Sequence, residues 1–213
     1  MINKLQITFV GVLFNFYLGN WAMAEEEKQL KSDNATASDS SSPVASYFNK
    51  DIAVYVQNDG EQIVVDADFL APVAPQQAWA VLTDFENISG FNPDILSSKV
   101  TDRTGNNLRV LQKSVTKYGF LSFAFESVRE INLVPFKKIQ ERMVSGNMRK
   151  MEETTQLTPE GKGTRVTYHG IFIPNVRIPS IGGHVLIKRE ARAQFEKVLN
   201  EMLRRNQVRV ARQ

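Results

Sequence analysis

The sequence of 213 residues contains no cysteine and only two histidines, His169 and His184. Disulfide bonds, thiolate metal sites and lipid attachment through a cysteine are therefore excluded. The two histidines lack the paired spacing of a zinc site, and no GxSxG motif marks a nucleophilic serine. We therefore assign no catalytic residue, no metal site and no cofactor from the sequence.

Long hydrophobic runs are also scarce, and the longest lies near the N-terminus, from Ile7 to Leu18. Lys4 is the only charge before it, and Ala22, Met23 and Ala24 follow before an acidic stretch. This three-part pattern is typical of a secretory signal peptide. We expect residues 1–24 to be removed after Ala24 and the protein to reach the periplasm. Although the run is short for a membrane span, an uncleaved anchor is the alternative.

Large apolar residues are nearly absent from residues 25–47, which are rich in serine, aspartate and glutamate. Such a segment buries too little surface to offset its ordering entropy, so we expect a disordered polar leader. The remaining chain is long enough for one domain, which we place at residues 48–207, followed by a basic tail at 208–213.

Alternating apolar and polar residues after residue 50 predict a strand-rich domain. The turn at Asn58 to Gly60 separates the first two strands, and Pro75 marks the start of a helix within residues 72–85. Residues 86–96 contain Gly90 and Pro93 and allow one helical turn at most. The predicted strands cover residues 52–56, 62–71, 98–102, 107–117, 121–133, 137–143, 148–158 and 164–173.

A long amphipathic helix is predicted over residues 181–206. Its apolar stripe contains Ile187, Ala191, Phe195, Val198, Leu199 and Met202, and its polar side includes Glu196, Lys197 and Glu201. Such a helix must place its stripe on one face of the sheet. The sequence therefore predicts an α+β fold in which a curved antiparallel sheet is covered by a long C-terminal helix.

The stretch VLTDFENISGFNPDILSSKV (Val81 to Val100) resembles the START-like superfamily (SRPBCC), which includes coenzyme Q-binding START domains and polyketide cyclase-like proteins. Further similarities are Val110-Leu111-Gln112, Gly119-Phe120, Val144-Ser145-Gly146 and residues 164–168, so that the resemblance covers residues 63–203. It implies the helix-grip fold, with an apolar cavity for a lipid, an isoprenoid or a quinone-like molecule. Residues Thr154 to Gln156 stand where relatives often carry tryptophan, so the identity of the ligand is not carried over.

With this fold, apolar side chains from the strands and from the helix stripe would line the cavity. The alternative is that they form an ordinary core. Lys188 and Arg192 lie at the edge of the stripe, either as a cationic rim for an acidic headgroup or with stems that reach into water. The ligand-binding candidates are Phe69, Phe123, Phe125, Val166, Tyr168, Phe172, Ile187, Lys188, Ala191, Arg192 and Phe195.

The resemblance leaves three functions open. The first is a binding protein that holds, and transports, a hydrophobic small molecule. The second is a cyclase or dehydratase that uses polar groups in the same cavity, for which Glu126, Arg129, Glu152 and Tyr168 are candidates. The third is an interaction module whose cavity is vestigial. We favour the first, because no pair of titratable groups is evidently confined to a shared pocket.

The C-terminal part is basic, with eight basic and three acidic residues from Ile181 onward. This excess favours transient contact with an anionic membrane surface, although a solvated face is the default interpretation. Nucleic acid is not expected as a partner, because the chain is predicted to be exported. We expect a monomer.

Overall fold

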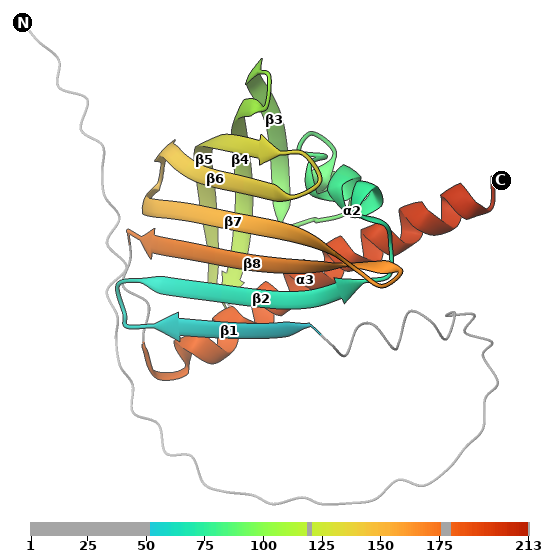
Figure 1. The fold of residues 1–213 in the computed structure, drawn as a ribbon. Coiled ribbons are helices and arrows are strands. Elements are labelled where there is room, and N and C mark those ends of the chain that lie inside the picture. Colours follow the sequence, from blue (N-terminus) through green and yellow to red (C-terminus); the bar gives the residue numbers. More distant parts are fainter. Residues whose placement is uncertain (1–51, 119–120, 176–179, 213) are drawn as a thin grey trace, which may run out of the picture. The chain divides into compact units, whose positions relative to one another are not determined.

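The computed structural model describes residues 52–118, 121–175 and 180–212 (Figure 1), and the side chains at 116–118, 121–123 and 180–182 lie outside the description. The predicted signal peptide at 1–24 and the predicted leader at 25–47 both precede the first described residue.

In the described part of the chain, eight strands form one antiparallel sheet in the order β1-β2-β8-β7-β6-β5-β4-β3. The predicted strands are confirmed, and β3 extends beyond both of its predicted ends. The bounds are β1 (Ala53–Asn58), β2 (Ile63–Ala71), β3 (Ile95–Thr104), β4 (Asn107–Tyr118), β5 (Leu121–Val134), β6 (Lys138–Gly146), β7 (Met148–Glu160) and β8 (Gly163–Pro174).

The turn between β1 and β2 is closed by its own side chains. Asn58 Oδ1 accepts a hydrogen bond from the Gly60 amide at 2.9 Å, and Asp59 Oδ1 accepts one from the Gln62 amide at 2.7 Å. Gly60 has φ of 94°, a conformation that costs other residues more. The sequence signal for this turn is therefore confirmed.

Helix α2 (Pro75–Leu82) connects β2 to the second half of the sheet. Pro75 is its first residue, where the missing amide hydrogen is not needed. The Gln77 side chain accepts a hydrogen bond from the Ala74 amide at 3.0 Å and satisfies this end of the helix. A single 3-10 turn, η1 (Ile88–Gly90), follows, as the glycine and proline pattern predicted.

Helix α3 (Ser180–Val210) has 31 residues and ends beyond the predicted Asn206. Leu199 and Met202 are fully buried, and the rest of the predicted stripe packs against the core. Glu201 differs from the prediction, because it is buried instead of solvated. Hydrogen bonds from Arg204 and Arg205 hold the pKa of Glu201 down to about 2.

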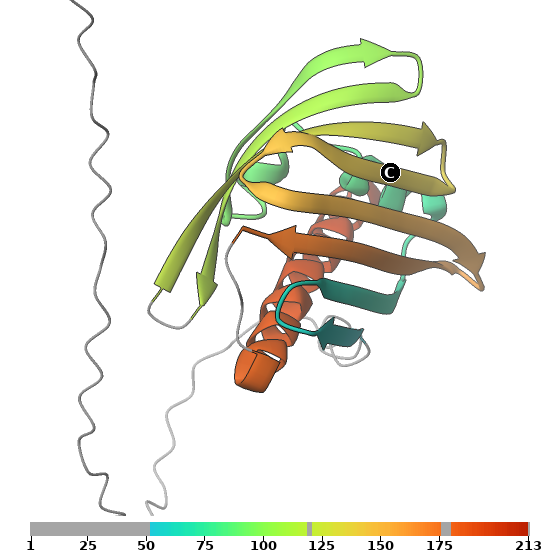
Figure 2. The same cartoon turned by 90° about the vertical axis from the view of Figure 1, so that its left-hand side faces the viewer.

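Helix α3 crosses one face of the sheet next to β1 and β2, and the sheet curves around it (Figures 1 and 2). The rings of Phe69 on β2 and Phe195 on α3 have centroids 5.9 Å apart, which identifies this side of β2 as the inner face. The α+β helix-grip arrangement predicted from the sequence is confirmed. No helix among the described residues is long and apolar enough to cross a membrane.

The segment between α2 and β3 holds α3 through polar contacts. The Asn92 amide donates a hydrogen bond to Gln194 Oε1 at 2.5 Å, and Gln194 donates one to Asp94 Oδ2 at 2.6 Å. Lys197 forms an ion pair with the same carboxylate. These contacts explain why the FNPD part of the stretch at 81–100 carries polar residues: they anchor the covering helix.

Among the described residues, the buried hydrophobic side chains form two clusters instead of one. The larger joins β1, β2 and β8 to α2 and α3, and the smaller joins β4, β5 and β6 to Phe85. Trp79 and Leu82 of α2 contact both clusters. The two apolar clusters therefore do not cover the whole inner face, and the rest of that face carries polar side chains.

Candidate functional site: a polar row on the inner face

Polar side chains from six adjacent strands lie across the inner face of the sheet. The strand register brings them together: Ser98 lies opposite Gln112, and Glu141 lies opposite Glu153. We call this set the inner polar row. It consists of Ser98 on β3, Gln112 on β4, Arg129 on β5, Glu141 on β6, Glu153 on β7 and Tyr168 on β8.

Arg129 is the centre of the inner polar row and is only 8% exposed. Its Nη1 atom lies 2.6 Å from Glu141 Oε2 and 3.7 Å from Glu153 Oε2. Its Nη2 atom donates a hydrogen bond to the Gln112 side chain. The Arg129 guanidinium thus lies within ion-pair distance of two carboxylates, in a position that is largely shielded from water.

Burial raises the pKa of Glu141 to about 7, although the charge of Arg129 opposes the rise and the charge of Glu153 adds to it. The single positive charge of Arg129 cannot neutralise the negative charges of both carboxylates where little water is present to solvate them. Near neutral pH, Glu141 therefore exchanges a proton readily, and it has the pKa expected of a general acid or base.

Tyr168 donates a hydrogen bond from its hydroxyl to Glu153 Oε1 at 2.5 Å. Burial and the neighbouring carboxylate raise the pKa of the Tyr168 phenol well above its ordinary value, so it remains protonated. Gly170 lies opposite Glu153, and a Cβ atom there would be 2.5 Å from the Tyr168 hydroxyl oxygen. The missing side chain at Gly170 therefore leaves the space in which the phenol reaches Glu153.

Aromatic rings connect this end of the row to α3. The rings of Tyr168 and Phe195 meet edge to face, with centroids 5.0 Å apart, and the Phe69 ring also contacts Phe195. An apolar wall on the helix side therefore borders the polar row on the sheet side. This combination suits an amphipathic small molecule better than a purely hydrocarbon one.

Two buried polar atoms have no hydrogen-bond partner among the described residues: Ser98 Oγ and Arg129 Nε. Both belong to the inner polar row, and both flank Gln112, from β3 and β5 respectively. Unpaired buried polar groups are rare in folded proteins and require an explanation.

Most of the ligand-binding candidates from the sequence come together in this region. Phe69 and Val166 are each 1% exposed, and Tyr168 and Phe172 are partly buried on the same face of β8. Ile187, Ala191 and Phe195 of α3 pack against them. Phe125 lies half-buried on β5, opposite Ser114, and the side chain of Phe123 lies outside the described residues.

Lys188 and Arg192 both contact β1 or the residue before it. The Lys188 ammonium is 5.9 Å from the centroid of the Tyr55 ring. Arg192 donates hydrogen bonds to the Ile52 carbonyl at 3.0 Å and to Glu196 at 3.1 Å. The two cations thus lie at the β1 edge of the sheet, at the opposite edge from β3.

Sequence reasoning missed Glu141 and Glu153 and named Glu126 and Glu152 in their place. Glu126 and Glu152 are on the outer face, where their side chains are 54% and 52% exposed and pair with lysines. The sequence did contain a signal for Glu141 and Glu153, because residues two apart along a strand lie on the same face of the sheet. Glu141 shares its parity with the buried Ile139, and Glu153 shares its parity with the buried Met151 and Leu157.

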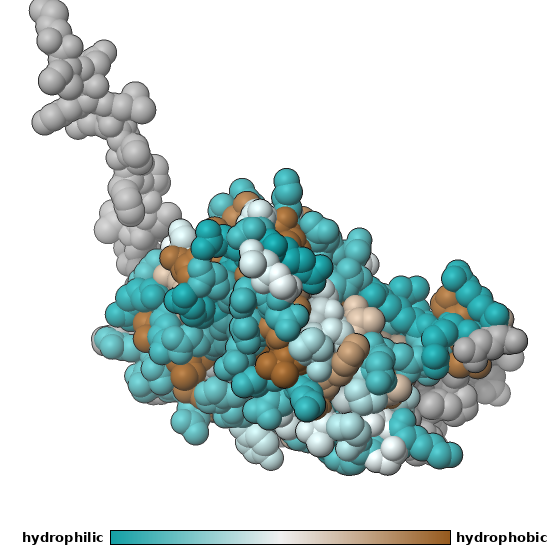
Figure 3. Space-filling model, turned by 45° about the horizontal axis from the view of Figure 1, so that its top comes forward, coloured by the Kyte–Doolittle hydropathy of each residue, from teal (hydrophilic) through white to brown (hydrophobic). Residues whose placement is uncertain are grey.

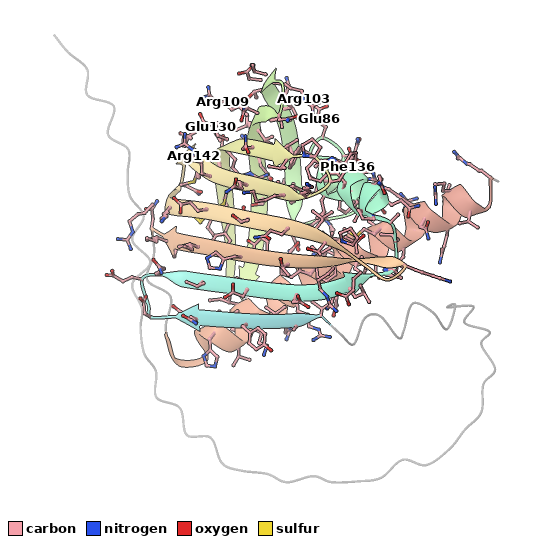
Figure 4. The ribbon with its side chains drawn as sticks, viewed as in Figure 1. Glu86, Arg103, Arg109, Glu130, Phe136 and Arg142 are labelled. Carbon is pink, nitrogen blue, oxygen red and sulfur yellow. The ribbon has the colours of Figure 1, made fainter. Side chains whose placement is uncertain are left out.

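A polar hollow of about 630 Å³ is lined mainly by outer-face side chains of the sheet, and Glu141 and Glu153 of the inner polar row also border it. Arg109, Glu130 and Arg142 project side by side from β4, β5 and β6 (Figure 4) and are joined by ion pairs. His169 also lines the hollow, with its Nδ1 atom 2.7 Å from Asp66. His169 and Tyr168 thus point to opposite faces, as expected for adjacent residues of a strand.

Hydrophilic side chains cover most of the face that is visible in Figure 3, and the hydrophobic ones there form separate small groups. Among the described residues, no three histidine, aspartate or glutamate side chains are grouped as a metal site would require. The chemical groups that stand out in the described part of the chain are therefore those of the inner polar row.

A curved antiparallel sheet that wraps around a long C-terminal helix defines the helix-grip class of protein. The model of one family, "Polyketide cyclase / dehydrase and lipid transport", matches residues 71–205. The chain belongs to this family, and the START-like resemblance seen in the sequence is confirmed. No curated protein matches the sequence.

Solved structures with the same fold share little sequence with this chain. The STAR-related lipid transfer protein of Xanthomonas axonopodis (fragment 25–204) is 16% identical, with a TM-score of 0.60 over 71% of this chain and 93% of that one. Human STARD10 is 13% identical, with a TM-score of 0.60 over 75% and 72%. The Zhui aromatase/cyclase of Streptomyces sp. R1128 is 12% identical, with a TM-score of 0.56 over 68% and 95%.

Proposed function

We propose that the protein binds a hydrophobic small molecule between the sheet and α3, and that the molecule's polar end meets the inner polar row. The observation that carries this proposal is the position of Arg129, Glu141 and Glu153 on an inner face whose two clusters of buried side chains are apolar. A core without a ligand would be more stable with well-packed apolar residues at such positions. A lipid, an isoprenoid or a quinone-like molecule has the required long apolar body.

We further propose that the protein acts after export as a carrier and makes transient contact with anionic membrane lipid. The signal-peptide pattern of residues 1–24 supports export. At the end of α3, Val208 and Val210 are exposed, and Arg209 and Arg212 form no ion pair with the described residues. Exposed apolar and cationic side chains together favour the surface of an anionic bilayer.

Native mass spectrometry of the full chain, expressed with its signal and purified without detergent, tests the binding proposal. We expect a mass excess that disappears on denaturation, and an apolar molecule in the organic extract. A protein of bare mass that also fails to take up lipids or quinones from vesicles would contradict the proposal.

A second function, cyclase- or dehydratase-like catalysis, is favoured by one specific observation. Glu141, with its pKa of about 7, lies beside Glu153 and the Tyr168 hydroxyl, so a proton donor and a proton acceptor share one place. Tyr168→Phe separates the two functions. In a carrier it changes ligand affinity modestly and no turnover exists to lose, whereas in an enzyme it reduces substrate conversion severely.

A further inference from the structure

The turn between β5 and β6 carries an aromatic residue where a smaller one is expected. The Lys137 amide donates a hydrogen bond to the Val134 carbonyl at 3.0 Å, which closes a β-turn with Pro135 second and Phe136 third. Phe136 has φ of 62°, a left-handed conformation for which glycine or asparagine is preferred at this position. Its side chain is nevertheless 45% exposed. A bulky residue that is both strained and exposed needs an explanation beyond the turn itself.

Packing within the domain accounts for only part of the Phe136 ring. The ring centroid lies 5.7 Å from that of Trp79 on α2, and the two ring planes are tilted by 58°. Trp79 packs against both apolar clusters of the core, whereas Phe136 belongs to neither. Phe136 therefore lies outside the core, in contact with Trp79 and with nearly half of its surface exposed.

Helix α2 joins this turn to the C-terminal end of α3. Its Trp79 contacts Phe136, and its Gln77 donates a hydrogen bond to the side chain of Asn206 on α3 at 2.8 Å. Figure 1 shows the β5–β6 turn, α2 and the C-terminal end of α3 at the same end of the sheet, and Figure 4 places Phe136 beside α2. Because α2 has only eight residues and is about 12 Å long, the turn and the end of α3 are close enough to meet one surface.

Exposed apolar side chains and cations gather at this end of the domain, which we call the α2 end. Four of the eight large apolar side chains that are exposed in the described part of the chain belong to it, and its cations form no ion pair with the described residues. The nearby carboxylates of Asp84 and Glu201 are already paired with arginines of α3. The α2 end therefore combines apolar surface with positive charge. Its apolar members are Val134, Phe136, Val208 and Val210, and its cations are Lys137, Lys138, Arg209 and Arg212.

We propose that the β5–β6 turn docks the protein on an anionic bilayer, with Phe136 in the headgroup region and the cations of the α2 end on lipid phosphates. This inference rests on the proposed function, since it specifies how the membrane contact of α3 is made. An aromatic ring is favoured at the level of the headgroups, and each nearby cation adds attraction to anionic lipid. The strain at Phe136 then has a reason, because glycine or asparagine in the turn would present no ring to the bilayer.

Trp79 is a natural fluorescent probe of this contact. The sequence has one other tryptophan, Trp21, which lies in the predicted signal peptide. The chain is expressed with its signal, recovered after processing and mixed with vesicles of phosphatidylcholine alone or with about 30% phosphatidylglycerol, the anionic component. We expect the protein to sediment with the anionic vesicles only. The Trp79 emission should then shift to shorter wavelength and be quenched by brominated lipid, because Trp79 lies directly behind Phe136.

Variants of Phe136 test the role of the ring. Phe136→Asn should weaken binding to the anionic vesicles about 10-fold, the value of taking half of an aromatic side chain out of water. Asparagine tolerates the left-handed conformation, so this variant is expected to fold, which thermal unfolding verifies. Phe136→Trp keeps an aromatic ring on Trp79 and should strengthen binding about 3-fold. Val185→Asn is the matched control, because it removes an exposed apolar side chain from the opposite end of α3 and should change nothing.

The cations are tested separately at Lys137, which is exposed on the same turn. Lys137→Gln should weaken binding to the anionic vesicles about 5-fold. Equal binding of the unmodified protein to neutral and anionic vesicles would overturn the role of the cations.

The outcomes separate this inference from the proposed function. If Phe136→Asn binds the anionic vesicles as tightly as the unmodified protein, or if Val185→Asn has the larger effect, the turn does not dock the protein and the proposed membrane contact stands without it. If the unmodified protein binds neither kind of vesicle, the proposed membrane contact fails and the inference fails with it. The proposed binding of a hydrophobic small molecule is unaffected by either result.

Discussion

Arg129 illustrates how one buried residue organises a site. Its guanidinium holds Gln112 and Glu141 and lies near Glu153, so removing it would leave two carboxylates without compensation. A charged cluster of this kind contributes little net stability, because desolvation offsets most of the attraction. Its presence on an inner face is therefore better explained by binding or chemistry than by folding.

Glu141 should make the stability of the protein depend on pH. Its pKa is raised from 4.5 to about 7, so between these values the folded state holds a proton that the unfolded state has lost. The free energy of unfolding should therefore fall as pH rises from about 4.5 to about 7, by at most about 3 kcal/mol. Glu141→Gln should remove this dependence, which urea unfolding at pH 5 and pH 8 measures.

The control for this prediction is Glu152→Gln, which removes an exposed carboxylate from the outer face and should preserve the dependence. If the Glu141→Gln variant kept the full difference in free energy of unfolding between pH 5 and pH 8, the raised pKa of Glu141 would not be correct.

Gly170 should be intolerant of even a methyl group. In Gly170→Ala the new Cβ would lie 2.5 Å from the Tyr168 hydroxyl oxygen and 2.7 Å from the Phe172 ring. The phenol must move away from Glu153, and we expect a loss of about 1–3 kcal/mol in the free energy of unfolding. Gly90→Ala is the matched control, because a Cβ there meets nothing within 4 Å. Similar melting temperatures for the two variants would contradict the prediction.

Among the elements, α3 depends on contacts from the segment that connects α2 to β3. Asp94 accepts from Gln194 and pairs with Lys197, and these groups are about three-quarters buried. Asp94→Ala should lower the free energy of unfolding by about 2 kcal/mol, because it removes two hydrogen bonds to a charged acceptor. Asp102→Ala, which removes an exposed carboxylate from β3, should change it little. Equal effects in chemical denaturation would show that the segment does not anchor α3.

The space under α3 can be tested at Ala191, which lies in the apolar stripe between Ile187 and Phe195. If this space holds a ligand, Ala191→Trp should keep or raise the melting temperature and abolish ligand binding, because the indole takes the ligand's place. If side chains fill the space, the variant should lose about 1–3 kcal/mol or more. Arg189→Trp adds the same ring at an exposed position and should have neither effect.

At the scale of the whole molecule, the proposed export predicts that residues 1–24 are removed. We expect the mature protein to begin at Glu25 and to be recovered from the periplasmic fraction, which intact-mass analysis measures. A full-length chain that remains in the membrane fraction would contradict this prediction and favour the uncleaved anchor.

The elements of the domain could be predicted from the sequence because their patterns are local. A period of two residues defines the strands, and a period of 3.6 residues defines α3 and its buried Leu199 and Met202. The same alternation separates Tyr168 from His169 and could have placed Glu153 on the inner face. The covering of the sheet by α3 follows, because an amphipathic helix must bury its stripe.

The inner polar row was decided only by the tertiary structure. Arg129, Glu141 and Glu153 become neighbours through the register of β5, β6 and β7, which depends on how all inner side chains pack together. The pKa of Glu141 likewise depends on the loss of water around it and on charges from two other strands. The alternation of a strand shows which face a charge occupies, but which charges share that place depends on contacts between residues far apart in the chain.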